Sequence, residues 1–488
     1  MSDHAFLPAT ELALRLRRRE LSSVGLLQHY LARIARLNPA LNAVVVLDAE
    51  RALQRAKAAD AALGRGEIWG PLHGLPMTVK ESFDVPGLAT TWGLEAQRGN
   101  IASRPAVAVQ RLQQAGAVIF GKTNVPVDLA DWQSFNPVYG TTHNPWDLSR
   151  TPGGSSGGSA VALAAGLTAL ELGSDIGASI RNPAHYCGVW GHKPTWGVVP
   201  QQGHQLPGTE CIDALDIAVV GPLARSAHDL TLSMDILATP LRAFGPLGWL
   251  PATWRDAGVP APRLRVAVID DDACAEVDAS VREHLRGLAG FLRSRGLTVT
   301  EQARPVDSAE AWETYVHLLR AATGAHLDDK EYEQARAHAA AHASGSRDFA
   351  GWNWRGVTLS HRDWVHHDDV RSKLRRQWAI FFETWDLLIC PVATTPAFKQ
   401  NQQGFRWQRM VPVNGHEQPS TSSLFWAGYP GLVGLPATAV PLGLSSDGLP
   451  IGAQVIGPVS ADPVCLRFAR WLEAEYRAFV PPPMAAAS

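Results

Sequence analysis

The sequence predicts an α/β protein with a layered fold around a largely parallel sheet. From about residue 65 onward, short apolar runs typical of β-strands alternate with alanine-rich stretches typical of helices. Strands that alternate with helices favour a layered fold and parallel strand pairing. The chain has 488 residues, of which 46% are hydrophobic and 18% charged. It is therefore long enough to bury a large core, and its composition is that of a folded globular protein.

The predicted elements follow in order along the chain. Residues 23–37 place Leu27, Leu31 and Ile34 on one face of an amphipathic helix. Residues 240–262 are rich in proline and glycine and are expected to form a connection, whereas residues 308–380 are helical in texture and rich in tryptophan. The predicted strands are MTVK (77–80), AVIFGK (117–122), ALELGSD (169–175), LRVAVID (264–270), DLLICPV (386–392) and AQVIG (453–457).

Charge and targeting signals narrow the class of protein. The formal net charge of -2 offers no electrostatic support for a nucleic-acid partner. Acidic residues interrupt the N-terminal stretch and no apolar run follows it, so no signal peptide is expected. No apolar run reaches the roughly 18 residues of a membrane-spanning helix. The five cysteines are scattered, which indicates reduced thiols and a cytoplasmic protein.

Two motif matches point to chemistry that their context does not support. GAVIFGKT (116–123) fits the phosphate-binding P-loop pattern, but its four middle residues are apolar and predict a buried strand instead of a flexible loop. GGSSG (153–157) fits the nucleophile elbow of α/β-hydrolases, which requires a hydrophobic strand directly before the turn. The residues that precede it, NPWDLSRTP, are polar and typical of a loop.

Two further patterns are also interpreted as structural. HAAAH (338–342) has the spacing of a helical zinc pair but lacks the glutamate of such a site, so surface histidines are expected and no metal site is predicted. The Gly/Ser run TPGGSSGGSA (151–160) has the composition of a flexible linker. It continues directly into an apolar helix and strand, however, which indicates a buried loop.

Two loops of small residues remain, together with one lysine. The glycines of GGSSGGS (153–159) and GSDIGASI (173–180) allow the backbone to approach a substrate closely, and their N–H groups can face a developing oxyanion. A serine nucleophile needs a base. The two candidates are His185, just beyond the second loop, and Lys80, which ends the apolar strand 77–79. Burial lowers the pKa of a lysine and so allows it to act as a base.

These segments resemble the amidase signature family of serine hydrolases. The resemblance rests on HGLPMTVK (73–80), GGSSGGS (153–159) and GSDIGASIR (173–181) in that order. It is reinforced by GKTN (121–124), YGTTHNPWD (139–147), HKPTWGVVP (192–200), AGYPGLVGLPATAVPLG (427–443) and GLPIGAQVIG (448–457). The match is strong over residues 65–225 and recognisable over 380–475, and several long elements in the same order make a chance match very improbable.

The resemblance implies a role for each matching residue. Ser179 corresponds to the nucleophile, Lys80 to the general base, and Ser155, after a cis peptide bond, to the serine that relays a proton between them. The implied oxyanion hole consists of the backbone N–H groups of Ile176, Gly177, Ala178 and Ser179, and the implied supporting residues are Gly154, Asp175 and Arg181. Ala178 departs from the family, which has glycine there. Because alanine tolerates a positive φ less well, either the loop differs in shape or this residue has a negative φ.

The resemblance implies a single α/β/α domain over residues 1–488, with a mixed, largely parallel central sheet flanked by helices. Its expected parts are an N-terminal helical region (1–64), the signature core (65–225), the tryptophan-rich helical segment (308–380) and the C-terminal part of the core (381–475). The helical segment is expected to cover the pocket, with residues 127–135 on another wall.

The expected activity is hydrolysis of a carboxylic amide, with esters and carbamates as further substrates, through an acyl-enzyme and without a cofactor. The expected partner is a small-molecule amide, with neither nucleic acid nor membrane, and a homodimer is left open. Two alternatives stay open: a subunit that releases ammonia from glutamine together with a partner chain, and a non-catalytic binding protein of the same fold.

Overall fold

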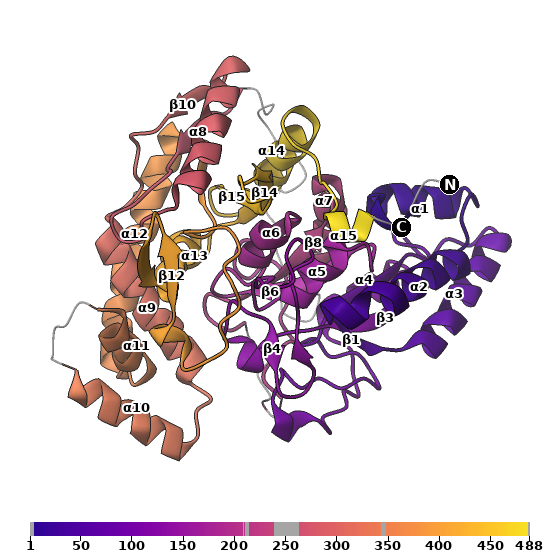
Figure 1. Cartoon of the computed structure of the whole chain (residues 1–488), viewed down its shortest axis with the longest axis horizontal. Helices are drawn as coiled ribbons and strands as arrows, with labels where there is room; N and C mark the ends of the chain where they lie inside the picture. Colours follow the sequence, from indigo (N-terminus) through magenta and orange to yellow (C-terminus); the bar gives the residue numbers. More distant parts are fainter. Residues whose placement is uncertain (1–3, 208, 210–213, 239–262, 343–347, 487–488) are drawn as a thin grey trace.

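A mixed sheet forms the centre of the computed structural model, which describes residues 4–207, 209, 214–238, 263–342 and 348–486. Within these residues the sheet has eight strands. Their order across the sheet is β10 (Thr298–Thr300), β9 (Arg265–Val268), β11 (Leu387–Pro391), β15 (Pro450–Ile456), β14 (Ala437–Leu444), β7 (Trp190–Lys193), β8 (Val219–Ala224) and β6 (Glu171–Asp175). Helices flank this sheet, as the sequence predicts (Figure 1).

The prediction that the sheet is largely parallel is wrong. Among the described strands of this eight-stranded sheet, only β10 with β9 and β9 with β11 pair in parallel, and the other five neighbouring pairs are antiparallel. The reason lies in strands that the sequence analysis did not expect, namely β7, β8 and β14. The turn of residues 445–449 joins β14 to β15 without a helix, and a connection this short permits only antiparallel pairing.

Two of the expected strands belong to a separate small sheet. β2 (Pro76–Lys80) and β3 (Val118–Thr123) pair in parallel, and β1 (Val44–Leu47) joins β3 in antiparallel orientation. β1 is also a strand within the N-terminal region that was expected to be helical. That region otherwise consists of helices, as predicted: α1 (Ala9–Arg17), α2 (Ser23–Leu41) and α3 (Ala49–Gly64).

The remaining helices surround the sheets and share one hydrophobic core with them. Those between β3 and β9 are α5 (Gly157–Ala164), α6 (Arg181–Cys187) and α7 (Ala227–Leu237), and α4 (Val107–Gln114) precedes β3. The others are α8 (Ala279–Ser294), α13 (Leu424–Gly431), α14 (Asp462–Glu475) and α15 (Pro483–Ala486). In the sequence of α5 no residue is larger than leucine, and the whole helix is buried.

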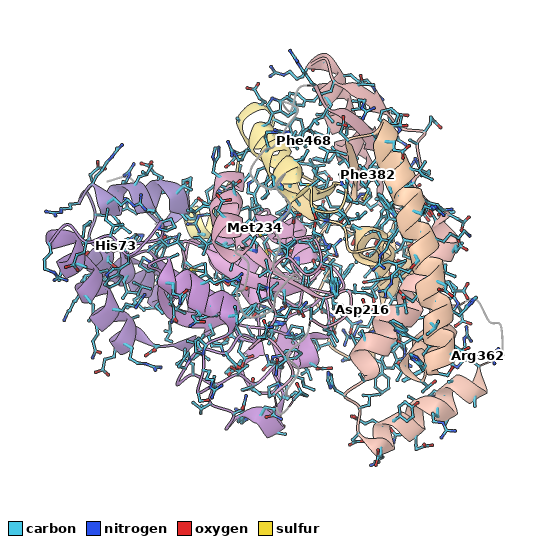
Figure 2. The ribbon with its side chains drawn as sticks, turned by 180° about the vertical axis from the view of Figure 1, so that it is seen from behind. His73, Asp216, Met234, Arg362, Phe382 and Phe468 are labelled. Atoms are coloured by element: carbon cyan, nitrogen blue, oxygen red, sulfur yellow. The ribbon has the colours of Figure 1, made fainter. Side chains whose placement is uncertain are left out.

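The tryptophan-rich segment is helical, as predicted. It comprises α9 (Ser308–Gly324), α10 (Asp329–Ala341), α11 (Phe349–Val357) and α12 (His361–Thr384), which gather at one end of the molecule, opposite α1 to α3 (Figure 1). Helix α12 runs along that side from near the labelled Arg362 to near Phe382 (Figure 2). The expected connection at residues 240–262 and Cys211 lie outside the described residues.

Candidate active site

The Gly/Ser run is a buried loop that leads into helix α5. Residues 151–156 are all buried, and no strand precedes them, which agrees with the rejection of a nucleophile elbow and of a flexible linker. The peptide bond between Gly154 and Ser155 is cis, and Gly153 has a φ of 87°. A side chain at Gly154 would overlap the carbonyl oxygen of Asp131, so only glycine fits at this close approach.

Lys80 is the last residue of β2, and its side chain is fully buried. Its Nζ lies 2.6 Å from Ser155 Oγ and 2.8 Å from Ser174 Oγ. Burial lowers the pKa of Lys80 to about 7, although the negative charges of Asp175 and Glu81 act in the opposite direction. The ammonium group therefore loses its proton near neutral pH, in contact with two hydroxyl groups.

Ser174 is a partner of Lys80 that the sequence analysis did not single out. It lies in β6, directly before Asp175, and is mostly buried. A signal was present in the sequence, because Ser174 is the second residue of the motif GSDIGASIR (173–181). Its role as a contact of Lys80 depends on packing between strands of two different sheets, and no local pattern encodes such a contact.

The second loop follows β6 and carries Ser179. The Ser179 side chain is 5% exposed, and its backbone carbonyl accepts a hydrogen bond from the N–H of Ser156 at 3.1 Å. This bond holds the two loops against each other, as the sequence analysis expected. Between the described residues, no direct hydrogen bond joins the hydroxyls of Ser155 and Ser179.

The Asp175 carboxylate organises the backbone of this loop. It accepts hydrogen bonds from the N–H groups of Ala178 at 2.9 Å and Ile180 at 3.1 Å. The N–H of Ala178, one of the four predicted oxyanion donors, is thus already engaged by Asp175 in this structure. In the described part of the chain, the N–H groups of Ile176, Gly177 and Ser179 have no acceptor and can face a substrate.

Ala178 also settles the question raised by its departure from the family. Its φ is 67°, so the alanine occupies the left-handed region and the alternative of a negative φ is wrong.

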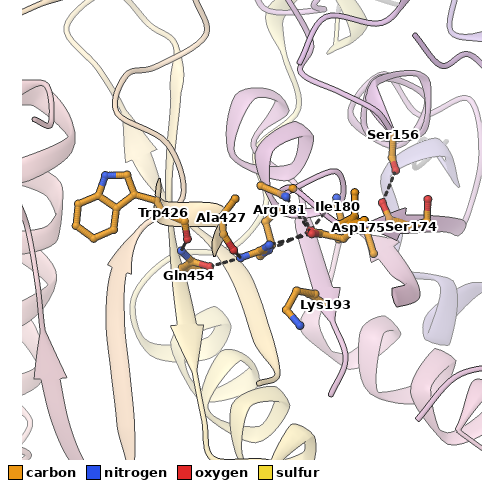
Figure 3. Close-up of polar contacts among 12 residues, drawn as sticks. Ser156, Ser174, Asp175, Ile180, Arg181, Lys193, Trp426, Ala427 and Gln454 are labelled. Carbon is orange, nitrogen blue, oxygen red and sulfur yellow. Dashed lines mark hydrogen bonds and ion pairs between the residues drawn. The ribbon is translucent and has the colours of Figure 1, made fainter. Parts of the chain in front are cut away.

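Arg181 connects the loop to helix α13 and to strand β15 in the middle of the central sheet (Figure 3). Its guanidinium group makes two contacts with Asp175, at 2.8 and 3.0 Å, and both side chains are fully buried. Burial acts to raise the pKa of Asp175, but the charge and hydrogen bonds of Arg181 outweigh it and hold the pKa below its ordinary value. Arg181 also donates to the carbonyl of Ala427 and to Gln454 Oε1. The loop is therefore anchored to α13 and β15.

Two other segments make hydrogen bonds to the backbone of the second loop, residues 173–180. Trp132 Nε1 donates to the carbonyl of Gly177 at 2.8 Å, and the Tyr315 hydroxyl of α9 donates to the carbonyl of Ile176 at 2.9 Å. The structure thus brings residues of 127–135 and of 308–380 to the same loop. Buried tryptophans of the second segment instead pack on one another, as Trp312 does on Trp352.

A cavity of about 240 Å³ lies beside Asp131, whose carbonyl contacts Gly154. Residues 127–135 and 308–380 were expected to line the substrate pocket; the first segment lines this cavity together with residues 404–409, and no residue of the second is among its lining residues. Its lining residues are Pro126, Val127, Ala130, Asp131, Phe135, Gly404, Phe405, Arg406, Trp407 and Arg409.

The other candidate residues from the sequence, namely His185, the P-loop match and the histidine pair, make structural contacts. His185, the rival base, is buried, and its ring nitrogens face the carbonyl of Thr395 at 3.0 Å and the N–H of Gly452 at 2.7 Å. The apolar centre of the P-loop match forms strand β3, as expected. His338 stacks on Trp354. Across the described residues, no group of three or more His, Cys, Asp or Glu side chains is placed to hold a metal ion, and no helix is long and apolar enough to span a membrane.

A buried lysine in contact with two serine hydroxyls, next to a loop that carries a further serine and free N–H groups, is an arrangement typical of serine hydrolases. The Amidase family matches residues 25–466, so the chain belongs to the amidase family, and its predicted activity as a hydrolase of amide C–N bonds is confirmed.

Individual relatives support this assignment. The chain is similar to an indoleacetamide hydrolase of Bradyrhizobium diazoefficiens, with 32% identity over 92% of this chain and 82% of that protein. It is 33% identical to a glutamyl-tRNA(Gln) amidotransferase subunit of Acidothermus cellulolyticus, over 98% of this chain and 96% of that protein. The structure of a 6-aminohexanoate cyclic dimer hydrolase with its substrate superposes with a TM-score of 0.81 at 25% identity, over 99% of this chain and 100% of the other.

Proposed function

We propose that the chain hydrolyses its amide substrate through an acyl-enzyme on Ser179, with Ser155 as the proton relay and Lys80 as the general base. The proposal is carried by the contact of 2.6 Å between Lys80 Nζ and Ser155 Oγ. A lysine with a pKa of about 7 is unprotonated in a large fraction of molecules at neutral pH. It can then accept a proton, which an ordinary lysine cannot do.

In the proposed first step, Lys80 takes the proton of Ser155 while Ser155 takes the proton of Ser179. The Ser179 oxygen attacks the amide carbonyl, and the N–H groups of Ile176, Gly177 and Ser179 stabilise the oxyanion. The proton then returns along the relay to the nitrogen of the leaving amine, and the C–N bond breaks. Water attacks the resulting ester in the same way, and the acid leaves. These steps need neither a metal nor an organic cofactor.

Ser179→Ala tests the proposal directly. The variant should lose turnover and covalent labelling by a fluorophosphonate probe, whereas wild-type protein should carry the probe on Ser179 in a peptide map. Ser156→Ala is a matched control, since Ser156 lies next to the relay serine and, among the described residues, its hydroxyl donates only to the Ser174 carbonyl, at 3.4 Å. A probe adduct on Ser155 instead of Ser179 would contradict the assignment. Wild-type protein that is never labelled would favour the non-catalytic binding protein.

The similarity to amidotransferase subunits keeps a second function open. A subunit of that kind would hydrolyse glutamine, and only together with a partner chain. The discriminating measurement is turnover of the isolated chain: rapid hydrolysis of other amides without glutaminase activity supports the free-standing enzyme that we propose.

A cytoplasmic location and a homodimer stay predictions, to be checked by fractionation and by light scattering. Ester and carbamate turnover belongs to the same substrate screen.

A further inference from the structure

Arg320 is the exception among the buried arginines of the molecule. Within the described residues, seven arginine side chains are more than nine-tenths buried, and six of them donate hydrogen bonds to carbonyl or carboxylate oxygens. Those six are Arg33, Arg111, Arg181, Arg225, Arg371 and Arg409. Arg320 is 5% exposed and makes neither a hydrogen bond nor an ion pair with any described residue, and its Nε is completely buried.

The surroundings of Arg320 do not compensate for its charge. Its stem packs against Gly356 of α11, and its guanidinium carbon lies 5.8 Å from the centre of the Phe349 ring. Burial and then the like charge of Arg406 lower the pKa of Arg320 well below its ordinary value, and the opposing effect of Tyr315 does not outweigh them. A buried charge without a partner is destabilising, so the folded protein alone provides no reason for this residue.

The position of Arg320 connects it to the candidate active site. It lies on α9 five residues beyond Tyr315, whose hydroxyl holds the Ile176 carbonyl of the oxyanion loop. Five residues of helix turn the chain by about 140°, so the two side chains leave the helix in different directions, but each of the two groups still acts electrostatically on the other. Arg406, which acts on Arg320 electrostatically, lines the cavity between residues 126–135 and 404–409. The unpaired guanidinium is therefore within electrostatic range of Tyr315, which holds the loop, and of Arg406, which lines the cavity.

We propose that Arg320 binds a carboxylate of the substrate, so that the enzyme acts on amides whose acyl chain ends in a carboxylate. A guanidinium group matches a carboxylate in shape and charge and can donate two parallel hydrogen bonds to it. The acyl part stays bonded to Ser179 in the acyl-enzyme, so an ion pair at its far end holds the carbonyl in the oxyanion site in both steps. Apolar lining residues such as Val127 and Phe405 suit the chain between the two groups.

This inference rests on the proposed function and is tested by a ratio of rates. The substrates are monoamides of linear dicarboxylic acids with four to eight carbons, each paired with the alkanamide that has a methyl group in place of the carboxylate. Wild-type protein should prefer the monoamide by at least about tenfold in kcat/KM at the best chain length, as expected for a buried hydrogen bond to a charged group. In Arg320→Met the ratio should fall to about one, through a higher KM for the monoamide.

Arg371→Met is the matched control. Arg371 is equally buried, but it is paired with Asp216 and Asp368 at 2.8 and 2.6 Å. This variant should keep the substrate ratio and melt at a lower temperature than wild type, whereas Arg320→Met should melt at the same or a higher temperature because it loses an unpaired charge. A wild-type ratio below about twofold at every chain length, or a preference that survives in Arg320→Met, overturns the proposal.

A binding measurement separates this proposal from the catalytic one. The linear dicarboxylates are the acids that hydrolysis of the monoamides would release. They should raise the melting temperature of Ser179→Ala, which cannot turn over, and should not do so for Ser179→Ala combined with Arg320→Met. If no amide is hydrolysed, the proposed mechanism fails, while this shift still supports the carboxylate site. If amides are hydrolysed and the shift is absent or does not depend on Arg320, the carboxylate site is refuted.

Discussion

Lys80 and Lys193 are nearly identical in their surroundings and differ in what they touch. Each is the last residue of a buried strand, β2 and β7 respectively, and neither is more than 1% exposed. Burial lowers the pKa of both lysines to about 7, and Asp175 opposes the shift in both. Lys80 contacts the hydroxyls of Ser155 and Ser174, whereas Lys193 contacts the carbonyl of Pro194 at 3.1 Å.

The difference between the two partners has a chemical consequence. A hydroxyl group can give its proton to a neutral amine and take one from a neighbour, but a carbonyl oxygen has no proton to give. A lowered lysine pKa therefore reflects burial in both places, and only at Lys80 does a partner exist that can relay a proton. Two buried arginines differ in a similar way. The guanidinium group of Arg181 donates hydrogen bonds to several oxygen acceptors, whereas Arg320 has no acceptor among the described residues.

The largest expected effect comes from removing each lysine in turn. Lys80→Met should lower kcat/KM by roughly 10³-fold or more, because a general base of this kind contributes about 10²–10⁴-fold and the relay also loses its end point. Lys193→Met should retain activity within about tenfold of wild type. Lys80→Arg should not restore turnover, since arginine stays protonated. Near-normal rates in Lys80→Arg would mean that another group is the base.

A second expected effect concerns the stability of the folded protein, and here the two lysines should behave alike. The unfolded chain holds a proton on each lysine up to a pH of about 10.4, whereas the folded chain releases it near pH 7. Between these values the folded state loses stability as the pH falls, by on the order of 4 kcal/mol per lysine at pH 7, and the loss is constant below that. Lys80→Met and Lys193→Met should each remove this dependence.

Urea unfolding between pH 7 and 9.5 measures the effect. The free energy of unfolding of either variant, relative to wild type, should increase steadily as the pH is lowered over this range. A difference that stays constant with pH would show that the lysine in question keeps its ordinary pKa in the folded protein.

The pH dependence of catalysis should again distinguish the two residues. Wild-type kcat/KM should rise about tenfold per pH unit up to a pH of about 7 and then level off, so that at pH 5 it is about a hundredfold below the plateau. Lys193→Met should show the same midpoint, because Lys193 has no proton relay. A midpoint that moves in Lys193→Met while activity persists would contradict the division of roles between the two lysines.

The smallest expected effect concerns the loop whose charges act on both lysines. Ala178→Gly relieves an alanine at a φ of 67° without altering any charge. It should raise the free energy of unfolding by about 0.5–1 kcal/mol, since the cost of a left-handed alanine exceeds the entropic cost of glycine. The pH midpoint of kcat/KM should stay where it is in wild type. Thermal denaturation and the pH profile check the two expectations, and a loss of stability would show that the alanine packs favourably.

Much of the candidate site could be predicted from local sequence. The apolar run before Lys80 predicts a buried strand, and the two runs of small residues predict loops whose backbone can approach a substrate closely. All six predicted strands exist, because each is a short apolar segment whose character is set by its own residues. The sheet direction was wrong since pairing depends on how distant strands meet, as the pair of β7 with β14 shows.

The sequence by itself determined the family, six of the strands and the serine and lysine residues that the proposed mechanism uses, because the motifs that hold them are contiguous. Only the tertiary structure decided their partners. Ser174 meets Lys80 across 94 residues of chain, and Asp175 accepts the N–H of Ala178, a predicted oxyanion donor. That Arg320 lacks a partner is decided in the same way, since whether a buried charge is satisfied depends on every segment packed around it.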